Sequence, residues 1–237
     1  MITVLYEDNH IIAVQKPAGV LTQGDGSGEK SLMDFVKDYL KEKYKKPGNV
    51  FLGLVHRLDK PVSGIVLFAK TSKGASRLSE QFRNHTIQKT YHAIVLGKLK
   101  NEKGQIKEKI NKISFFAEGF GEKSDEELLA EIKKATKTRT GELSYKVESY
   151  KVHKDGSVYS LVKIMPKTGR FHQIRVQMAE MGNPILGDRK YSNVNMPDWK
   201  DNNAIALCAT DIEFKLATKD EIKKISIDLP ESWQKYL

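Results

Sequence analysis

The first feature of the sequence that could do chemistry is a carboxylate between two cations. Asp59 lies in the segment 56–64, HRLDKPVSG, directly between Leu58 and Lys60 and two positions after Arg57. Positive neighbours lower the pKa of a carboxylic acid and keep it ionised, as a nucleophile or general base requires. The ordinary alternative is an aspartate that hydrogen-bonds to the backbone of its own turn, a common role for this residue type.

A second polar segment, 166–175 (PKTGRFHQIR), opens a predicted helix over residues 171–181 that ends at Gly182. His172 and Arg175 are three positions apart and therefore neighbours on one helical face, from which Arg175 could reach an acidic partner in a cleft. Arg170 lies where the helix begins, near backbone amides that favour phosphate. For Arg175 the alternative is an ordinary salt bridge at the surface. The apolar residues of the same helix are expected to pack into the core: Phe171, Ile174, Met178 and Met181.

Tyr91 is the third candidate, within the predicted strand 89–97. A tyrosine in a strand more often packs in the core or on the sheet surface than takes part in catalysis. At the mouth of a cleft, however, its ring could stack on an unpaired base.

Composition favours a polyanionic partner. Lys and Arg total 40 against 30 Asp and Glu, a net charge of +10 in 237 residues, and RNA is the commonest partner of such a surplus. Solubility alone is the alternative explanation. Cys208 is the single cysteine, which excludes an intrachain disulfide and a zinc site built on paired cysteines, and the six histidines show no ligand spacing. We therefore expect no metal, and without a signal sequence or a long apolar run we expect a cytoplasmic protein.

The elements that must position these residues are mostly strands. Ser31 and Asp34 resemble a capping box at the start of an amphipathic helix, and a second helix is predicted over 72–83. The predicted strands are 2–7, 10–14, 65–69, 89–97, 143–151, 157–165, 205–208, 211–214 and 225–228. Strands that follow one another directly indicate an α+β fold with a mixed, largely antiparallel sheet, flanking helices and a cleft.

Residues 100–141 form an uncertain basic insertion within a single catalytic domain spanning 1–237. The segment is lysine-rich, with a predicted short helix from Asp125 to Ala135. A solvated face and a contact with RNA phosphates are equally good readings of its basic stretch, Lys133, Lys134, Lys137 and Arg139.

Four segments occur in the order found in the RluA-type pseudouridine synthase family, which the chain resembles from about residue 3 to 230. They are LYEDNHIIAVQKPAG, HRLDKPVSG, KTYHAIVLG and TGRFHQIRVQMAEMGNPILGDRKY. The chain departs from the pattern at Val62, where many members have Thr, and at Ser192, where many have Gly. Many members also carry an N-terminal S4 RNA-binding domain, which we do not expect here because the catalytic pattern begins near residue 3.

The resemblance implies roles for the matching residues. Asp59 is similar to the essential aspartate, Arg175 to the arginine that pairs with it, and Tyr91 to the tyrosine that stacks on the target uracil. Arg57 is similar to the arginine that fills the space left by the flipped base. Further candidates for substrate binding come from the same segments: His56, Arg170 and His172.

These residues predict an isomerase that converts specific uridines in structured rRNA or tRNA to pseudouridine. The reaction keeps all atoms, so it requires no cofactor and no metal, but the base must leave its stack. Asp59 either attacks C1′ or removes the C2′ proton. The alternatives are a non-catalytic RNA-binding or ribosome-assembly factor on the same fold, and a hydrolase that needs a second carboxylate near Asp59. A monomer is the default expectation.

Overall fold

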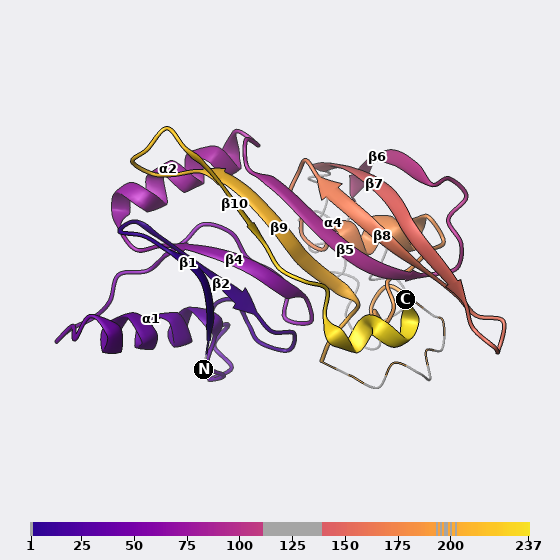
Figure 1. The fold of residues 1–237 in the computed structure, drawn as a ribbon, viewed down its shortest axis with the longest axis horizontal. Coiled ribbons are helices and arrows are strands. Elements are labelled where there is room, and N and C mark those ends of the chain that lie inside the picture. Colours follow the sequence, from indigo (N-terminus) through magenta and orange to yellow (C-terminus); the bar gives the residue numbers. More distant parts are fainter. Residues whose placement is uncertain are drawn as a thin grey trace, which may run out of the picture.

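The computed structural model describes residues 2–110, 139–192, 194, 196, 199, 201 and 203–237. In this part of the chain ten strands form one sheet, in the order β1-β2-β4-β9-β5-β8-β7-β6, with β3 paired to β4 and β10 to β9 (Figure 1). The strands are β1 (Thr3–Glu7), β2 (Ile11–Lys16), β3 (Gly53–Leu54), β4 (Ser63–Ala69), β5 (Gln88–Leu96), β6 (Lys103–Ile110), β7 (Arg139–Val152), β8 (Val158–Pro166), β9 (Leu207–Lys215) and β10 (Ile222–Ser226). The helices are α1 (Leu32–Lys43), α2 (Ser72–Arg83), α4 (Gln173–Glu180) and a terminal 3-10 helix, η1 (Glu231–Tyr236).

One parallel junction lies at the centre of an otherwise antiparallel sheet. β4 and β9 pair in parallel through Ser63 with Cys208 and Gly64 with Ala209, whereas every other named strand pair is antiparallel. Gly64 has φ +125°, and a Cβ at this position would lie 2.4 Å from the backbone nitrogen of Ala209. Only glycine allows this approach without strain. The predicted α+β fold with a mixed, largely antiparallel sheet is confirmed.

Helices α1 and α2 cover opposite faces of β2 and β4, as Figure 1 shows. Alternate residues of a strand point to opposite faces, so Val14 and Val66 join the core cluster of α1, while Ile65 joins that of α2 and its Leu78. The predicted capping box is present: the Ser31 hydroxyl accepts the Asp34 amide hydrogen and the Asp34 carboxylate accepts from the Ser31 backbone. The packing of α1 and α2 on β2 and β4 thus holds in place the strands next to the loop that carries Asp59.

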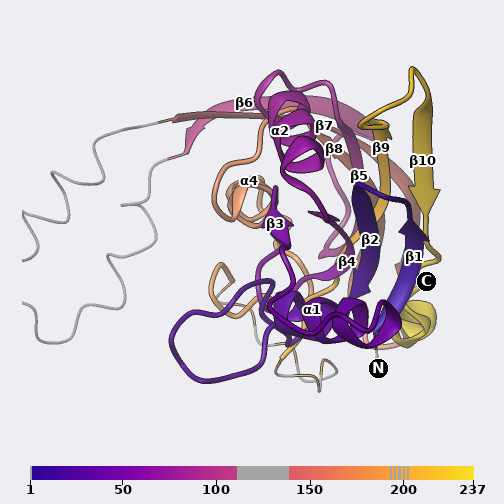
Figure 2. The ribbon, with the colours of Figure 1, turned by 90° about the vertical axis from the view of Figure 1, so that its left-hand side faces the viewer.

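Helix α4 lies beneath the arch of β6 and β7 (Figure 2). The Gln177 side chain donates to the Gly141 carbonyl at 3.2 Å and holds the helix there. The helix begins at Gln173, later than predicted, so Phe171 precedes it and is 53% exposed. The prediction that Phe171 packs into the core was wrong because it assumed helical geometry that has not yet begun at that residue.

Two further differences concern strands. Lys103–Ile110 is β6, a strand that the sequence did not predict because its exposed lysines hide the alternation. The predicted strands 205–208 and 211–214 are one continuous strand, β9 (Leu207–Lys215), since Ala209 pairs with Gly64 and Tyr91 and Thr210 is only a bulge residue between them. The predicted helix from Asp125 to Ala135, with Lys133, Lys134 and Lys137, lies outside the described residues. None of the helices in the described part is both long and apolar enough to cross a membrane.

Candidate active site

All seven predicted site residues line one cavity of about 510 Å³. They are His56, Arg57, Asp59, Tyr91, Arg170, His172 and Arg175. The volume falls within the range of small-molecule pockets, roughly 300–1,000 Å³. The cavity lies between the loop that precedes β4, strand β5 and the start of α4, so three segments distant in sequence meet there.

The Asp59 carboxylate is held through one oxygen. Nη1 of Arg175 and Nε2 of His172 each lie 3.3 Å from Oδ2, and within the described part of the chain Oδ1 has no hydrogen-bond partner. The side chain is 25% exposed. Asp59 lines the cavity, and its carboxylate keeps one oxygen that the described side chains do not engage.

The electrostatics of Asp59 differ from the sequence prediction. Burial raises the pKa of Asp59, and the attraction of Arg175 only partly opposes this rise. Lys60 points elsewhere and pairs with Glu29 at 2.6 Å, and Arg57 contributes less than Arg175. Arg57 does lower the pKa of Asp59, but the expected net lowering was wrong, because the effect of burial is larger.

Arg175 is buried between two carboxylates. Its Nε and Nη2 donate to Asp188 at 2.7 and 2.8 Å, and Nη1 donates to Asp59 at 3.3 Å. Arg175 is 5% exposed and Asp188 is 0% exposed. The alternative of a surface salt bridge for Arg175 is therefore contradicted.

His172 closes the same side of the cavity as a neutral ring. Its Nδ1 lies 2.6 Å from the Tyr191 hydroxyl, and burial together with Arg175 and Lys190 lowers its pKa to about 3. The residue has φ +52°, a left-handed conformation that is uncommon outside glycine. The turn before α4 thus holds the imidazole beside Asp59 without adding a charge.

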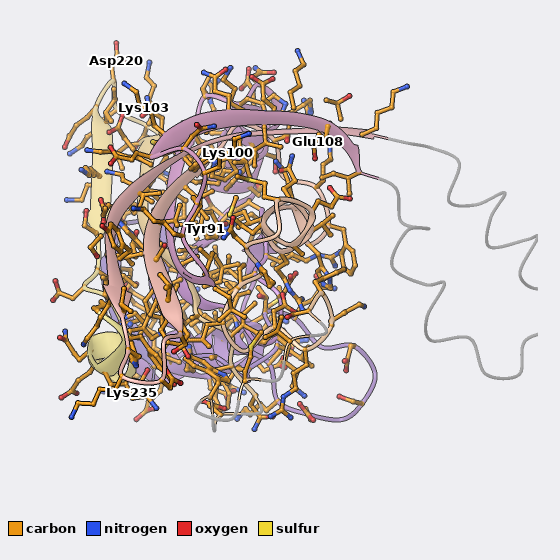
Figure 3. The ribbon with its side chains drawn as sticks, turned by 90° about the vertical axis from the view of Figure 1, so that its right-hand side faces the viewer. Tyr91, Lys100, Lys103, Glu108, Asp220 and Lys235 are labelled. Atoms are coloured by element: carbon orange, nitrogen blue, oxygen red, sulfur yellow. The ribbon has the colours of Figure 1, made fainter. Side chains whose placement is uncertain are left out.

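Tyr91 extends from β5 into the interior, well away from the peripheral side chains Lys103 and Asp220 that Figure 3 also labels. Its pairing with β9 shifts register between Thr90 and Tyr91, a bulge that can redirect a side chain. Burial, and secondarily the charge of Asp59, raise the pKa of Tyr91. The phenol therefore keeps its proton and offers the cavity a neutral aromatic face.

The remaining candidates occupy the wall and rim. His56 accepts the Leu67 amide hydrogen at 2.9 Å and stacks on Phe82, so it forms part of the wall. Burial lowers the pKa of His56 to about 3. Arg57 is exposed at the rim, and Nε of Arg170 donates to the Thr140 carbonyl at 3.2 Å.

Sequence reasoning missed two buried residues, Lys16 and Asp188. Lys16 is 0% exposed, and its Nζ donates to the carbonyls of Pro17, Val20 and Lys60 at 3.0, 2.6 and 3.0 Å. Burial lowers the pKa of Lys16 to about 8, although the charge of Asp59 opposes this. Both residues lie in the quoted segments QKPAG and GDRKY, yet only burial distinguishes them from surface charges.

Comparison with known proteins agrees with this geometry. A family model described as RNA pseudouridylate synthase matches residues 10–180. This chain belongs to that family. Ribosomal large subunit pseudouridine synthase C of Buchnera aphidicola is 34% identical over 204 residues, covering 85% of this chain and 58% of the relative. tRNA pseudouridine synthase C of Vibrio parahaemolyticus is 32% identical over 242 residues, covering 98% and 92%.

A solved human structure, RNA Pseudouridylate Synthase Domain Containing 4, has the same fold, with a TM-score of 0.72 at 22% identity over 98% of this chain and 90% of that one. The family model and the two curated relatives confirm the resemblance to RluA-type pseudouridine synthases. The region matched by the RNA pseudouridylate synthase model contains Asp59, Tyr91 and Arg175, whereas Asp188 and Tyr191 lie beyond its end. Contacts from Arg175 and His172 thus connect the cavity to a later turn of the chain.

Proposed function

We propose that this chain isomerises specific uridines of structured RNA to pseudouridine, with Asp59 as the reacting carboxylate. One observation carries the proposal: Asp59 lines a cavity together with Tyr91, and Arg175 and His172 both contact the same oxygen of its carboxylate. A carboxylate that is oriented but not fully neutralised is suited to act as a nucleophile or a base.

The surroundings of the cavity suit an RNA strand. The chain carries a net charge of +10, and cationic side chains line the cavity: Arg57, Arg83, Lys89 and Arg170. Such side chains hold phosphates, while the target nucleotide must leave its stack to reach Asp59. In this proposal Arg57 fills the space left by the base, Arg170 contacts the backbone, and His56 and His172 shape the wall around the nucleotide.

The reaction conserves all atoms. The bond from uracil N1 to C1′ breaks, the base turns within the cavity, C5 bonds to C1′, C5 loses its proton and N1 gains one. Asp59 starts this sequence either by attack on C1′ or by removal of the C2′ proton. Arg175 keeps Asp59 oriented, and Tyr91 packs on the uracil ring. No cofactor or metal enters the scheme.

We leave the substrate class as rRNA or tRNA, because the two relatives are named for one each. We further propose that the enzyme is cytoplasmic and that it is a monomer. The single cysteine, Cys208, is a buried free thiol, as is usual where no disulfide stabilises the chain.

Two other functions make different predictions. A binding or assembly factor would hold RNA without chemistry. A hydrolase would need a second acid in the cavity, and Asp188 is unsuited to that role because it is fully buried and already bonded to Arg175.

The test uses RNA labelled with tritium at uridine C5, taken from cells that lack the gene. The wild-type protein is expected to release tritium and to leave pseudouridine in the digested RNA. Asp59→Asn is expected to bind the RNA with similar affinity and release none. Free uracil would identify a hydrolase, and binding without tritium release by the wild type would identify a binding factor.

A further inference from the structure

The segment GDRKY contains a buried acid, Asp188, to which the proposed reaction assigns no role. Asp188 is 0% exposed, and its two oxygens accept from Nε and Nη2 of Arg175 at 2.7 and 2.8 Å. Two parallel bonds between an arginine and a carboxylate fix the guanidinium plane. Asp188 therefore sets the orientation of Arg175.

The turn that carries Asp188 is attached to the sheet. The Asp188 amide donates to the Ile185 carbonyl at 3.0 Å, and Ile185 bridges to Val95 of β5. The Leu186 amide also donates to the Ile94 carbonyl at 2.9 Å. The turn that carries Asp188 is thus bonded to β5, the strand that carries Tyr91. A strand is a rigid support for a site that requires fixed geometry.

The nitrogens of the Arg175 guanidinium differ in the lengths of their contacts. Its contacts with Asp188 are 2.7 and 2.8 Å, whereas its contact with Asp59 is 3.3 Å. The Tyr191 ring covers the guanidinium, with 5.0 Å from Cζ to the ring centroid. Arg175 is therefore bound mainly to Asp188 through Nε and Nη2, and its Nη1 lies between Asp59 at 3.3 Å and the His172 ring at 3.2 Å.

We propose that Asp188 is a positioning residue for the reaction. Asp188 fixes the guanidinium of Arg175 and shares the positive charge of Arg175 with Asp59, so that Asp59 is oriented without being fully neutralised. The inference rests on the proposed function. It extends the site by a residue that never touches the substrate and acts through Arg175.

The charge balance at Arg175 is the physical reason why Asp188 would aid the reaction. With Asp59 ionised, two carboxylates share one guanidinium. When Asp59 bonds to the ribose or takes up a proton, its charge is lost, and Arg175 with Asp188 remains as a neutral pair. Without Asp188, that step would leave a buried unpaired cation, which is strongly unfavourable. The negative charge of Asp188 also raises the pKa of Asp59 and so makes it a stronger base.

The test compares Asp188→Asn, which keeps the shape and removes the charge, with wild type in the tritium assay. We expect kcat to fall by about tenfold or more with the Kd for RNA unchanged. Removing a negative charge lowers the pKa of Asp59, so the acid limb of the kcat profile should move to lower pH. A purely structural role would not move that limb.

Asp34→Asn is the matched control, a partly buried acid that caps α1 and does not line the cavity, and its kcat profile should equal that of wild type. A wild-type kcat and acid limb in a folded Asp188→Asn protein would overturn the inference. Inactivity of the wild type itself would instead overturn the proposed function.

A second measurement covers the case in which Asp188→Asn does not fold. Nitrogen-15 NMR of Asp59→Asn follows the Nε–H group of Arg175. Anchoring by Asp188 predicts that this signal stays sharp and slow to exchange with solvent when Asp59 has lost its charge. A signal that broadens or exchanges rapidly would contradict the inference, whatever the activity of the wild type.

Discussion

Two partly buried carboxylates of this protein stand in opposite electrostatic situations. The Glu7 carboxylate on β1 accepts hydrogen bonds from four side chains: Lys43, Lys70, Tyr39 and Tyr44. Among the described residues, Asp59 has only Arg175, which it shares with Asp188, and the neutral His172. The Glu7 side chain is 8% exposed and that of Asp59 is 25% exposed, so the less exposed acid is not the one whose pKa is raised.

The number of donors explains the difference. Burial by itself would raise the pKa of Glu7, but bonds from Lys43, Lys70 and Tyr44 lower it to about 2. At Asp59 burial prevails and the pKa is raised. An acid with a full set of donors stabilises the fold, whereas one with an incomplete set keeps its reactivity. The comparison teaches that the catalytic candidate is the acid that the fold leaves incompletely neutralised.

The largest expected effect on stability comes from Glu7→Gln. Removal of this charge leaves Lys70 partly buried without its ion pair, and we expect a loss of about 1–3 kcal/mol in the free energy of unfolding. Urea denaturation measures it, with the exposed Glu29→Gln as the matched control. Turnover per folded molecule should not change. Equal stability of the two variants would break the comparison.

The same substitution has a defined pH dependence. The folded-state pKa of Glu7 is lowered from 4.5 to about 2, so its contribution is present above pH 4.5 and is lost as the pH falls toward 2. The stability difference between wild type and Glu7→Gln should therefore shrink over that window. A difference that stays constant across it would show that packing, not charge, is responsible.

A smaller effect of the opposite sign is expected for Asp59→Asn. Because the folded-state pKa of Asp59 is raised, its ionised form costs stability, and this cost grows as the pH rises through that pKa. At neutral pH we expect the variant to equal or exceed wild type in stability, by less than about 1 kcal/mol. Thermal unfolding followed by circular dichroism measures the change. A clear loss of stability would mean that Asp59 is a structural acid like Glu7.

The smallest effect is expected for Lys60→Ala. The Lys60 side chain pairs with the exposed Glu29 and not with its sequence neighbour Asp59. We expect a change of ~0.5 kcal/mol or less in stability, and an acid limb of turnover at the wild-type pH. A shift of that limb to higher pH in Lys60→Ala would restore the flanking-cation explanation for Asp59.

The sequence predicted what short-range patterns determine. The helix over 72–83 and the strand after the Asp59 loop follow from local periodicity, and the capping box at Ser31 follows from one hydroxyl and one carboxylate three positions apart. The family resemblance then brought Asp59, Tyr91 and Arg175 together in one prediction. These residues line a single cavity in the structure.

What the sequence could not predict depends on burial across long distances in the chain. Asp188 is a buried partner of Arg175, and Lys16 supports the Asp59 loop through the Lys60 carbonyl, but both read as ordinary surface charges in the sequence. The direction of the pKa shift at Asp59 was wrong for the same reason, since desolvation belongs to the folded protein and not to the neighbours along the chain.

Pseudouridine mapping of total RNA tests the central claim most directly. Cells that lack the gene are complemented with wild type, Asp59→Asn or Lys60→Ala. We predict that at least one site is lost on deletion, is restored by wild type and by Lys60→Ala, and stays unmodified with Asp59→Asn at equal protein level. Restoration by Asp59→Asn, or a map unchanged by deletion, would contradict the account.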